Sequence, residues 1–221
     1  MADIRSVEWT GGENGRVRIL DQTRLPGEEV YLEIDTLEAA CEAIRSLRVR
    51  GAPLLGVFGL YALALGLREH GSVGARTALT SSAEKIKATR PTAVNLSAEI
   101  DSFVRSVGEV DDMSVLLGMT VSRANAVARA DSAANAMIGQ HGQELIENDG
   151  LYLTHCNTGS LAATGIGTAL GVFKAAHRAG KRFRILVPES RPLLQGSRLT
   201  AWELEREGIP YKLCCESALG A

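Results

Sequence analysis

The residues best suited to chemistry lie in the stretch LTHCNTGS, where Cys156 follows strand-forming residues and precedes the turn-forming sequence Asn-Thr-Gly. This order predicts a buried strand over residues 151–155, a turn, and then a helix with Ser160 as its N-cap. A thiol near the N-terminus of a helix is stabilised as a thiolate, which suits a nucleophile or a proton carrier. The competing interpretation is that Cys156 is a small buried hydrophobic residue.

Two further stretches place an arginine beside a break in the backbone. In VRGAP, Arg50 precedes Gly51 and Ala52 at a predicted helix start, where a guanidinium and backbone N–H groups can hold a phosphate together. In TRPTAVNL, Arg90 comes just before a proline, which restricts the backbone of the residue that precedes it. A structural role in capping the preceding helix is the alternative for each arginine.

A fourth stretch, ESRPLLQGSRLTAWEL, follows a second predicted strand and contains Gln195 among several charged residues. Ligands of open α/β sheets bind at the carboxyl ends of the strands, so Gln195 is placed where a substrate can be held. A solvated loop is the alternative, although the apolar residues 192–194 indicate packing against the protein.

The N-terminal part that must position the two arginines is predicted to be a small β-meander followed by helices. The strands are IRSVEW, RVRILDQ and EVYLEI, separated by turns rich in glycine and proline. Apolar spacing predicts helices over residues 35–48, 53–67, 77–88 and 97–107, and a long helix after residue 112 that ends near residue 147. The second of these helices is apolar all round, which is typical of a helix at the centre of a core.

From residue 149 the pattern changes to alternating strands and helices. We expect strands at 151–155, 183–187 and 210–214, with helices over 160–178 and from Gly196 to Gly208. Such alternation indicates a parallel sheet with right-handed crossovers. The predicted fold class is therefore α/β: an N-terminal β-meander and helical domain with a connecting helix over residues 1–148, then an incomplete Rossmann-like parallel domain over 149–221.

Composition narrows the function classes. A formal net charge of −2 over 221 residues gives no reason to expect nucleic acid or an acidic membrane surface as a partner. The four cysteines have no metal-ligand spacing, and we interpret them as reduced thiols of a cytoplasmic protein. The N-terminus lacks the apolar core of a signal peptide, and we expect no run to approach the ~18 apolar residues that span a membrane.

The four stretches together resemble one family, the methylthioribose-1-phosphate isomerases. VRGAP is a weak match when taken singly, but LTHCNTGSLAATGIGTALGV together with ESRPLLQGSRLTAWEL is specific, and the likeness covers essentially the whole chain. The resemblance implies an aldose–ketose isomerase of methionine salvage that opens the ring of 5-methylthioribose 1-phosphate and forms the ribulose 1-phosphate. The resemblance also implies that the reaction uses no metal and no organic cofactor, and it suggests that the protein is a homodimer.

The resemblance also implies a role for each matching residue. Cys156 would be the catalytic thiol, whereas Arg50, Gly51, Ala52, Arg90 and Gln195 would bind the substrate. The hydrogen that passes between C1 and C2 can move as a proton through an enediol or as a hydride.

The chain departs from the family pattern in three places. The family's catalytic aspartate lies in a G-A-D-R type segment well downstream, which these 221 residues do not contain, so we expect a truncated or partial chain that is inactive alone. Ser190 stands where the family usually has threonine. Cys214-Cys215-Glu216-Ser217 stands where it usually has a threonine-aspartate stretch, which bears on substrate preference.

Two alternatives remain open at this point. An isomerase of ribose 1,5-bisphosphate or of a 5-deoxyribose 1-phosphate would use the same thiol with a different pocket for the 5-substituent. A non-catalytic protein like the regulatory subunits of initiation factor 2B would share the fold and bind ligands or partners, but it is not expected to keep HCNTG, RPLLQG and both arginines.

Overall fold

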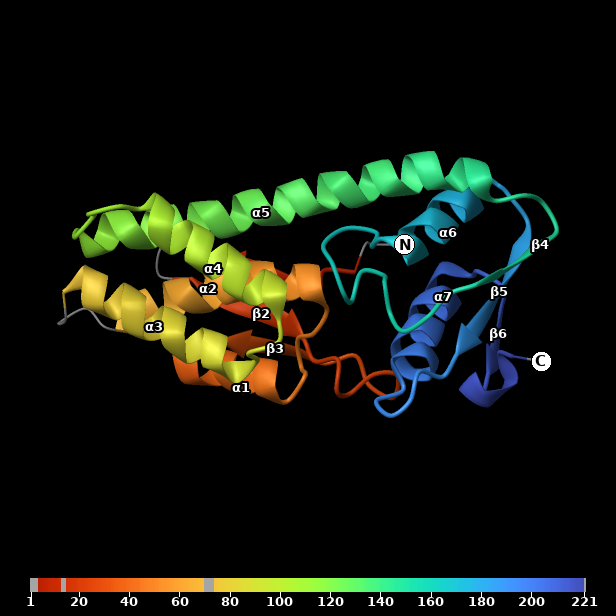
Figure 1. Cartoon of the computed structure of the whole chain (residues 1–221), viewed down its shortest axis with the longest axis horizontal. Coiled ribbons are helices and arrows are strands. Elements are labelled where there is room, and N and C mark those ends of the chain that lie inside the picture. The colour runs from red at the N-terminus through yellow and green to blue at the C-terminus, as the bar shows by residue number, and fades with distance from the viewer. Residues whose placement is uncertain (1–3, 13–14, 70–73, 221) are drawn as a thin grey trace. The chain divides into compact units, whose positions relative to one another are not determined.

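The structure is a computed structural model that describes residues 4–12, 15–69 and 74–220. The chain divides into two compact units (Figure 1). The helical unit comprises Ser6–Thr23 and Val30–Ala130, and the parallel-sheet unit comprises residues 4–5, Arg24–Glu29 and the chain from Asp131 onward. The chain passes from one unit to the other between Ala130 and Asp131, and the short segment Arg24–Glu29 belongs to the second unit.

The N-terminal sheet has the predicted meander topology. Strands β1 (Val7–Thr10), β2 (Arg16–Leu20) and β3 (Tyr31–Ile34) pair in the antiparallel order β1-β2-β3, with Val17 opposite Trp9 and Ile34. Val17 and Ile19 are fully buried, while Arg16, the first residue of β2, is exposed. The alternation of apolar and polar residues along β2 therefore turns one face of the sheet toward the helices.

Helices complete this unit, and their bounds are close to those predicted. They are α1 (Leu37–Arg45), α2 (Ala52–Glu69), α3 (Ala75–Thr89), α4 (Val94–Ser106) and the N-terminal part of α5 (Met113–Gly142). Thr36 caps α1, because its hydroxyl accepts a hydrogen bond from Ala39 N at 3.2 Å. The prediction that α1 continues to Arg48 was wrong, since the chain leaves the helix after Arg45 and Leu47 adopts a φ of +64°.

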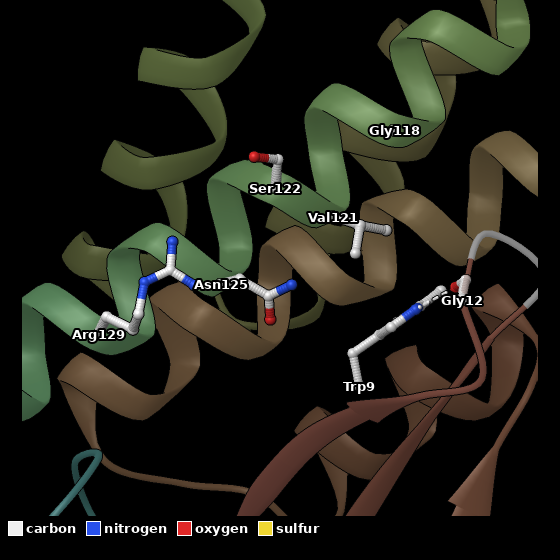
Figure 2. Close-up of a pocket in the computed structure, with 7 residues that line it drawn as sticks. All are labelled: Trp9, Gly12, Gly118, Val121, Ser122, Asn125 and Arg129. Carbon is white, nitrogen blue, oxygen red and sulfur yellow. Dashed lines mark hydrogen bonds between the residues drawn. The ribbon is translucent and has the colours of Figure 1, made fainter.

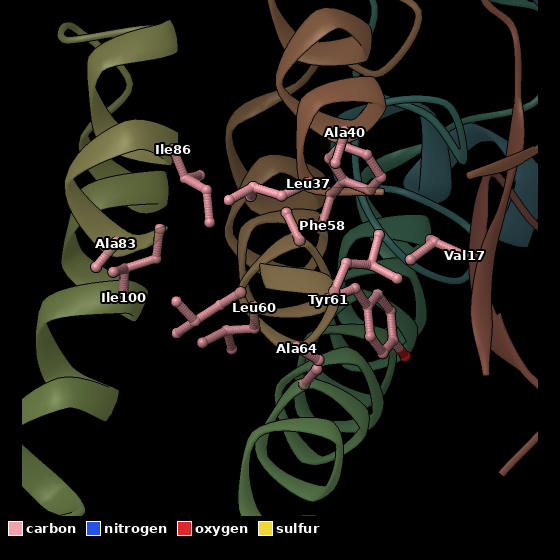
Figure 3. Close-up of a cluster of buried hydrophobic side chains, with 14 of the residues drawn as sticks. Val17, Leu37, Ala40, Phe58, Leu60, Tyr61, Ala64, Ala83, Ile86 and Ile100 are labelled. Carbon is pink, nitrogen blue, oxygen red and sulfur yellow. The ribbon is translucent and has the colours of Figure 1, made fainter. Parts of the chain in front are cut away.

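Helix α2 forms the core of the helical unit (Figure 3). Every residue from Leu54 to Leu67 is buried, as expected for a helix that is apolar all round. By length and composition α2 could cross a membrane, which corrects the expectation that no run is long enough, but 78% of it is buried inside the protein. Glycines on α2 let neighbouring helices approach, since a Cβ at Gly59 would lie 2.4 Å from a methyl of Leu96 on α4.

The parallel-sheet unit is built on three strands. They are β4 (Gly150–Leu153), β5 (Phe183–Pro188) and β6 (Tyr211–Cys214), paired in parallel in the order β4-β5-β6, so the prediction of a parallel sheet is confirmed. Helices α6 (Ala169–Arg178) and α7 (Ala201–Glu207) connect them and lie on one side of the sheet (Figure 1). Tyr152, Phe173 and Phe183 pack together under α6, with ring centroids 5.8–6.2 Å apart.

The start of α6 differs from the prediction. A helix was expected from Ser160, but residues 154–168 form an irregular loop and the helix begins at Ala169. The loop starts like a helix, because the N–H groups of Ala162 and Ala163 both bond to Gly159 O. It then stops, because Asp131 and Asn135 on α5 bind the N–H and the C=O of Thr164, which a continuing helix would have used.

The close packing of α2 gives a stability prediction that uses two glycines of the helical unit. A Cβ at Gly66 on α2 would lie 2.4 Å from Ser82 Oγ and 2.8 Å from Ser82 Cβ, whereas one at Gly118 on α5 meets nothing within 4 Å. Helix propensity favours alanine at both positions and therefore cancels in the comparison. We expect Gly66→Ala to be less stable than the control Gly118→Ala by about 1–3 kcal/mol in urea unfolding. Equal stability of the two variants would show that α3 moves away at no cost.

Candidate active site

Cys156 lies just after β4, in the loop that leaves the carboxyl end of the sheet. Its backbone is left-handed, with a φ of +60°, which costs a residue with a side chain about 1–2 kcal/mol. Two hydrogen bonds hold it there: Cys156 N donates to Ser190 Oγ at 3.0 Å, and Thr200 Oγ1 donates to Cys156 O at 2.5 Å. With both backbone groups fixed, the direction of the partly buried thiol side chain is set by the fold.

Ser190 lies in the loop after β5 and is the partner that links the two loops. It is buried and also left-handed, with a φ of +61°. Its hydroxyl accepts from Cys156 N, so serine supplies here the same kind of acceptor that a threonine would. Gln195 is partly buried at the end of this loop, before a π-helical turn, Gly196–Thr200. Gly196 is required, because a Cβ would lie 1.7 Å from Pro188 O.

A buried ion pair contacts the loop that contains Cys156 and holds it in place. Lys174 on α6 and Glu203 on α7 are 1% and 0% exposed, and Lys174 Nζ lies 2.7 Å from Glu203 Oε2. The carboxylate also accepts from Asn157 Nδ2 at 2.9 Å, from Ser160 N at 2.8 Å and from Leu161 N at 3.3 Å. The Glu203 carboxylate therefore satisfies buried N–H groups of the loop that would otherwise need hydrogen bonds to water.

The shape of this loop shows that Cys156 is not held at the N-terminus of a helix. The next helix along the chain, α6, begins at Ala169, so Cys156 does not stand at the N-terminus of the helix that the sequence had suggested. Gly167 allows the tight fold of the loop, because it has a φ of +87° and a Cβ there would lie 2.4 Å from Gly159 Cα. The physical support for Cys156 is thus a network of hydrogen bonds and not a helix dipole.

A third loop, after β6, joins the other two. Glu216 Oε2 accepts from Arg191 N at 2.9 Å, and Cys214 O accepts from Glu189 N at 3.0 Å. His155 Nδ1 lies 4.0 Å from Glu216 Oε1 on the exposed side of this edge. The loops after all three parallel strands are therefore linked at the carboxyl edge, which is where ligands of such sheets bind.

The other predicted site residues belong to the helical unit and lie at two helix ends. Arg50 is partly buried, Gly51 has a φ of +92° and Ala52 is the exposed first residue of α2. Arg90 is the C-cap of α3, and its N–H donates to Lys87 O at 3.3 Å.

The two turns lie at the same end of the helical unit, because α2 and α4 run in the same direction. A Cβ at Gly56 would contact Asn95 and Glu99, and one at Gly59 would contact Leu96 and Ile100. The N-termini of both helices therefore lie together, which brings the VRGAP and TRPTAV turns to one end. That these turns meet the Cys156 and Gln195 loops of the parallel-sheet unit stays a prediction.

Lys174, Glu203 and Thr200 support the Cys156 loop but were not among the site residues predicted from the sequence. A signal was present in the sequence, because Lys174 follows Phe173 on the apolar face of α6 and Glu203 precedes Leu204 on that of α7. A lysine and a carboxylate that both fall on buried faces predict a paired charge.

Comparisons with known proteins place the chain among two kinds of relatives. The model of a family described as the initiation factor 2 subunit family matches residues 48–221. A methylthioribose-1-phosphate isomerase from Desulforudis audaxviator is 44% identical over 98% of this chain and 62% of its own length. One from Syntrophotalea carbinolica is 42% identical over 99% and 64%. The chain therefore spans less than two thirds of the length of these curated relatives.

Two solved structures are similarly close. Subunit delta of the translation initiation factor eIF-2B from A. fulgidus has a TM-score of 0.86 and 37% identity, and covers 98% of this chain and 64% of its own. The 5-methylthioribose 1-phosphate isomerase from Pyrococcus horikoshii OT3 has a TM-score of 0.86 and 34% identity over 97% and 61%. Fold similarity alone thus does not separate the two kinds of relatives.

The stability of the parallel-sheet unit should depend on the buried ion pair. Lys174→Met leaves the Glu203 carboxylate buried without its cation, so we expect a loss of about 3–5 kcal/mol in the free energy of unfolding. Urea unfolding of the variant and of wild type measures the loss.

The matched control is Glu207→Gln, one turn further on α7, where the carboxylate lies 3.8 Å from Lys174 Nζ and is partly exposed. This control should cost less than about 1 kcal/mol. Adding Glu203→Gln to Lys174→Met should recover part of the loss, because the unpaired charge is removed. A Lys174→Met protein as stable as wild type would contradict the support that we assign to the pair.

Proposed function

The chain belongs to the initiation factor 2 subunit family, and from this premise we propose that it is the thiol-bearing part of an aldose–ketose isomerase that acts on 5-methylthioribose 1-phosphate. The observation that carries the proposal is the pair of left-handed residues Cys156 and Ser190, joined by a hydrogen bond at the carboxyl edge of the sheet. Strained backbone of this kind persists where the surroundings hold it and is concentrated at active sites. The curated relatives named as isomerases support the same assignment.

The proposed reaction needs no external oxidant or reductant, because substrate and product are isomers. The ring oxygen leaves C1 and takes a proton, one hydrogen passes from C2 to C1, and the C2 hydroxyl loses its proton to become the ketone. We assign the proton transfer to the Cys156 thiol, whose backbone is fixed from two sides. A loop held in advance by its own hydrogen bonds loses little entropy when the substrate binds.

Substrate binding is proposed for residues of both units. Arg50 with the backbone of Gly51 and Ala52 offers a guanidinium and N–H groups of a helix start to the phosphate, and Arg90 adds a second cation at the same end. Gln195 supplies an amide to the sugar hydroxyls from the loop after β5. We propose a homodimer in the cytoplasm as the working form.

The acid that completes the chemistry is proposed to lie in the aspartate-bearing segment that the family resemblance implies. These 221 residues contain no match to that segment, so we propose that they have no turnover alone. Activity is therefore to be assayed both on the 221 residues and on any longer chain that the gene encodes.

A second candidate function is a regulatory subunit that binds a ligand or a partner without turnover. It is favoured by the 37% identity to a structure described as an initiation factor subunit. An isomerase of ribose 1,5-bisphosphate or of 5-deoxyribose 1-phosphate is the third candidate. A panel of these three sugar phosphates separates the candidates, because the regulatory protein turns over none of them.

The thiol gives the first test. Cys156→Ala in an active longer chain should abolish conversion of 5-methylthioribose 1-phosphate to its ketose and leave substrate binding intact, measured by a turnover assay and by calorimetry. The matched control is Cys41→Ala, on α1 of the helical unit, which should keep turnover near the wild-type rate. Cys41 cannot substitute for Cys156, because it is fully buried and burial raises the pKa of its thiol. Turnover that survives Cys156→Ala would remove the thiol from the mechanism.

The arginines give the second test. Arg90→Gln or Arg50→Gln should weaken binding of the sugar phosphate about tenfold or more, because each removes a charge-assisted hydrogen bond. The control is Arg105→Gln, in the last turn of α4. Arg90 precedes the first turn of α4, so the two arginines lie at opposite ends of this helix. If the first two variants bind as tightly as the control, the phosphate site lies elsewhere.

A further inference from the structure

The helical unit contains a hollow that the proposed reaction does not use. It has a volume of about 430 Å³ and lies between the N-terminal sheet and α5 (Figure 2). Its described lining residues are Trp9, Gly12, Gly118, Val121, Ser122, Asn125 and Arg129. Tyr61, which packs against Trp9, lies nine residues along α2 from Ala52, or about 14 Å of helix rise. The aromatic end of the hollow is therefore separate from the VRGAP turn.

One end of the hollow is a fixed aromatic wall. The indole N–H of Trp9 donates to Gly12 O at 2.6 Å, and the ring stacks on Tyr61 with centroids 5.8 Å apart and planes 22° apart. Val121 lies beside Trp9 on α5 (Figure 2), and Gly118 one turn earlier leaves open space, since a Cβ there meets nothing within 4 Å. A flat ring can bind against such a wall without first ordering it.

The other end of the hollow offers hydrogen-bond donors. Tyr61 OH donates to Asn125 Oδ1 at 2.7 Å, and the amide nitrogen of Asn125, a residue that lines the hollow (Figure 2), is a donor. Burial raises the pKa of Tyr61 to about 12, so its hydroxyl keeps the proton that fixes this orientation. Arg129 follows one turn later on the same face of α5 and is exposed. The described lining includes no acid, and the nearby Glu8 is paired with Arg18 at 3.3 Å.

The spacing of the two ends selects the kind of ligand. Val121 and Arg129 are eight residues apart on α5, which corresponds to about 12 Å along the helix. A ring that carries its charge directly cannot reach both Trp9 and Arg129, whereas a ring joined to its phosphate through a sugar can. We propose that this hollow binds a nucleoside monophosphate, with the base against Trp9 and the phosphate on Arg129. The proposal is independent of the isomerase reaction.

Calorimetry on the 221-residue chain tests the proposal with adenosine monophosphate, adenosine and inorganic phosphate as probes. The monophosphate should bind more tightly than either of its parts. Arg129→Gln should weaken its binding about tenfold and leave adenosine unchanged, because the variant removes a charge-assisted contact. Gly118→Leu should fill the hollow and remove the binding of both, with thermal unfolding as the check that the variant is folded. In Trp202→Phe, which keeps Trp9 as the only tryptophan, the monophosphate should change the fluorescence emission.

The matched control is Arg123→Gln on the same helix, where the guanidinium pairs with Glu99 outside the hollow. It should bind adenosine monophosphate like wild type. The proposal is overturned if wild type does not bind the monophosphate, if inorganic phosphate binds equally well, or if Arg129→Gln binds like wild type. Equal weakening by Arg123→Gln and Arg129→Gln would also overturn it, since that result indicates a diffuse attraction to a basic surface.

Discussion

The parallel-sheet unit depends on one buried carboxylate. Glu203 is fully buried, and removing a charge of this kind from water costs several kcal/mol unless partners replace the lost hydration. Lys174 supplies the opposite charge, and Asn157 with two backbone N–H groups of the loop supplies the remaining hydrogen bonds. Because these donors come from α6 and from the loop after β4, the carboxylate on α7 fixes the position of all three. Gly159 is part of the same constraint, since a Cβ there would lie 2.2 Å from the carboxylate.

The loop conformation at Cys156 follows from this constraint. A left-handed residue other than glycine is unfavourable by itself and persists only when its neighbours leave no alternative. Thr200, which bonds to Cys156 O, is on the turn that leads into α7, one helical turn before Glu203. Asn157 bonds to both Thr200 and Glu203. The energy that holds the thiol loop in place is thus supplied by buried polar contacts just below it, so the loop can stay ordered before any ligand arrives.

The sequence predicted those parts of the fold that depend on local pattern. Alternation and turn residues indicated the meander, helical spacing indicated α1 to α5, and the return of strand-forming runs indicated the parallel sheet. The helix predicted from Ser160 failed for a non-local reason. Leu161, Ala162 and Ala163 are good helix formers, but Asp131 and Asn135, some thirty positions earlier on α5, bind the backbone of Thr164. A window of neighbouring residues contains no record of such partners.

The point along the chain at which one unit ends and the other begins also depends on non-local contacts. Helix α5 is continuous over 30 residues, so its apolar spacing shows no boundary. What changes along it is the partner: Asn125 bonds to Tyr61 of the helical unit, whereas Asn135 bonds to the Cys156 loop region at Thr164.

The candidate site was partly readable because its residue types are unusual where they occur. A cysteine in a glycine-rich turn and arginines beside breaks in the backbone are visible in the sequence, and the structure has Cys156 and Gln195 on linked loops of one sheet edge. The supporting pair was overlooked because a lysine and a glutamate are ordinary residue types, and only their positions on the apolar faces of α6 and α7 mark them. This difference also explains why fold similarity does not decide between an isomerase and a regulatory subunit. The Lys174–Glu203 network would hold the loop equally well for catalysis or for binding, so the decision rests on the group that the loop presents, which is the thiol of Cys156.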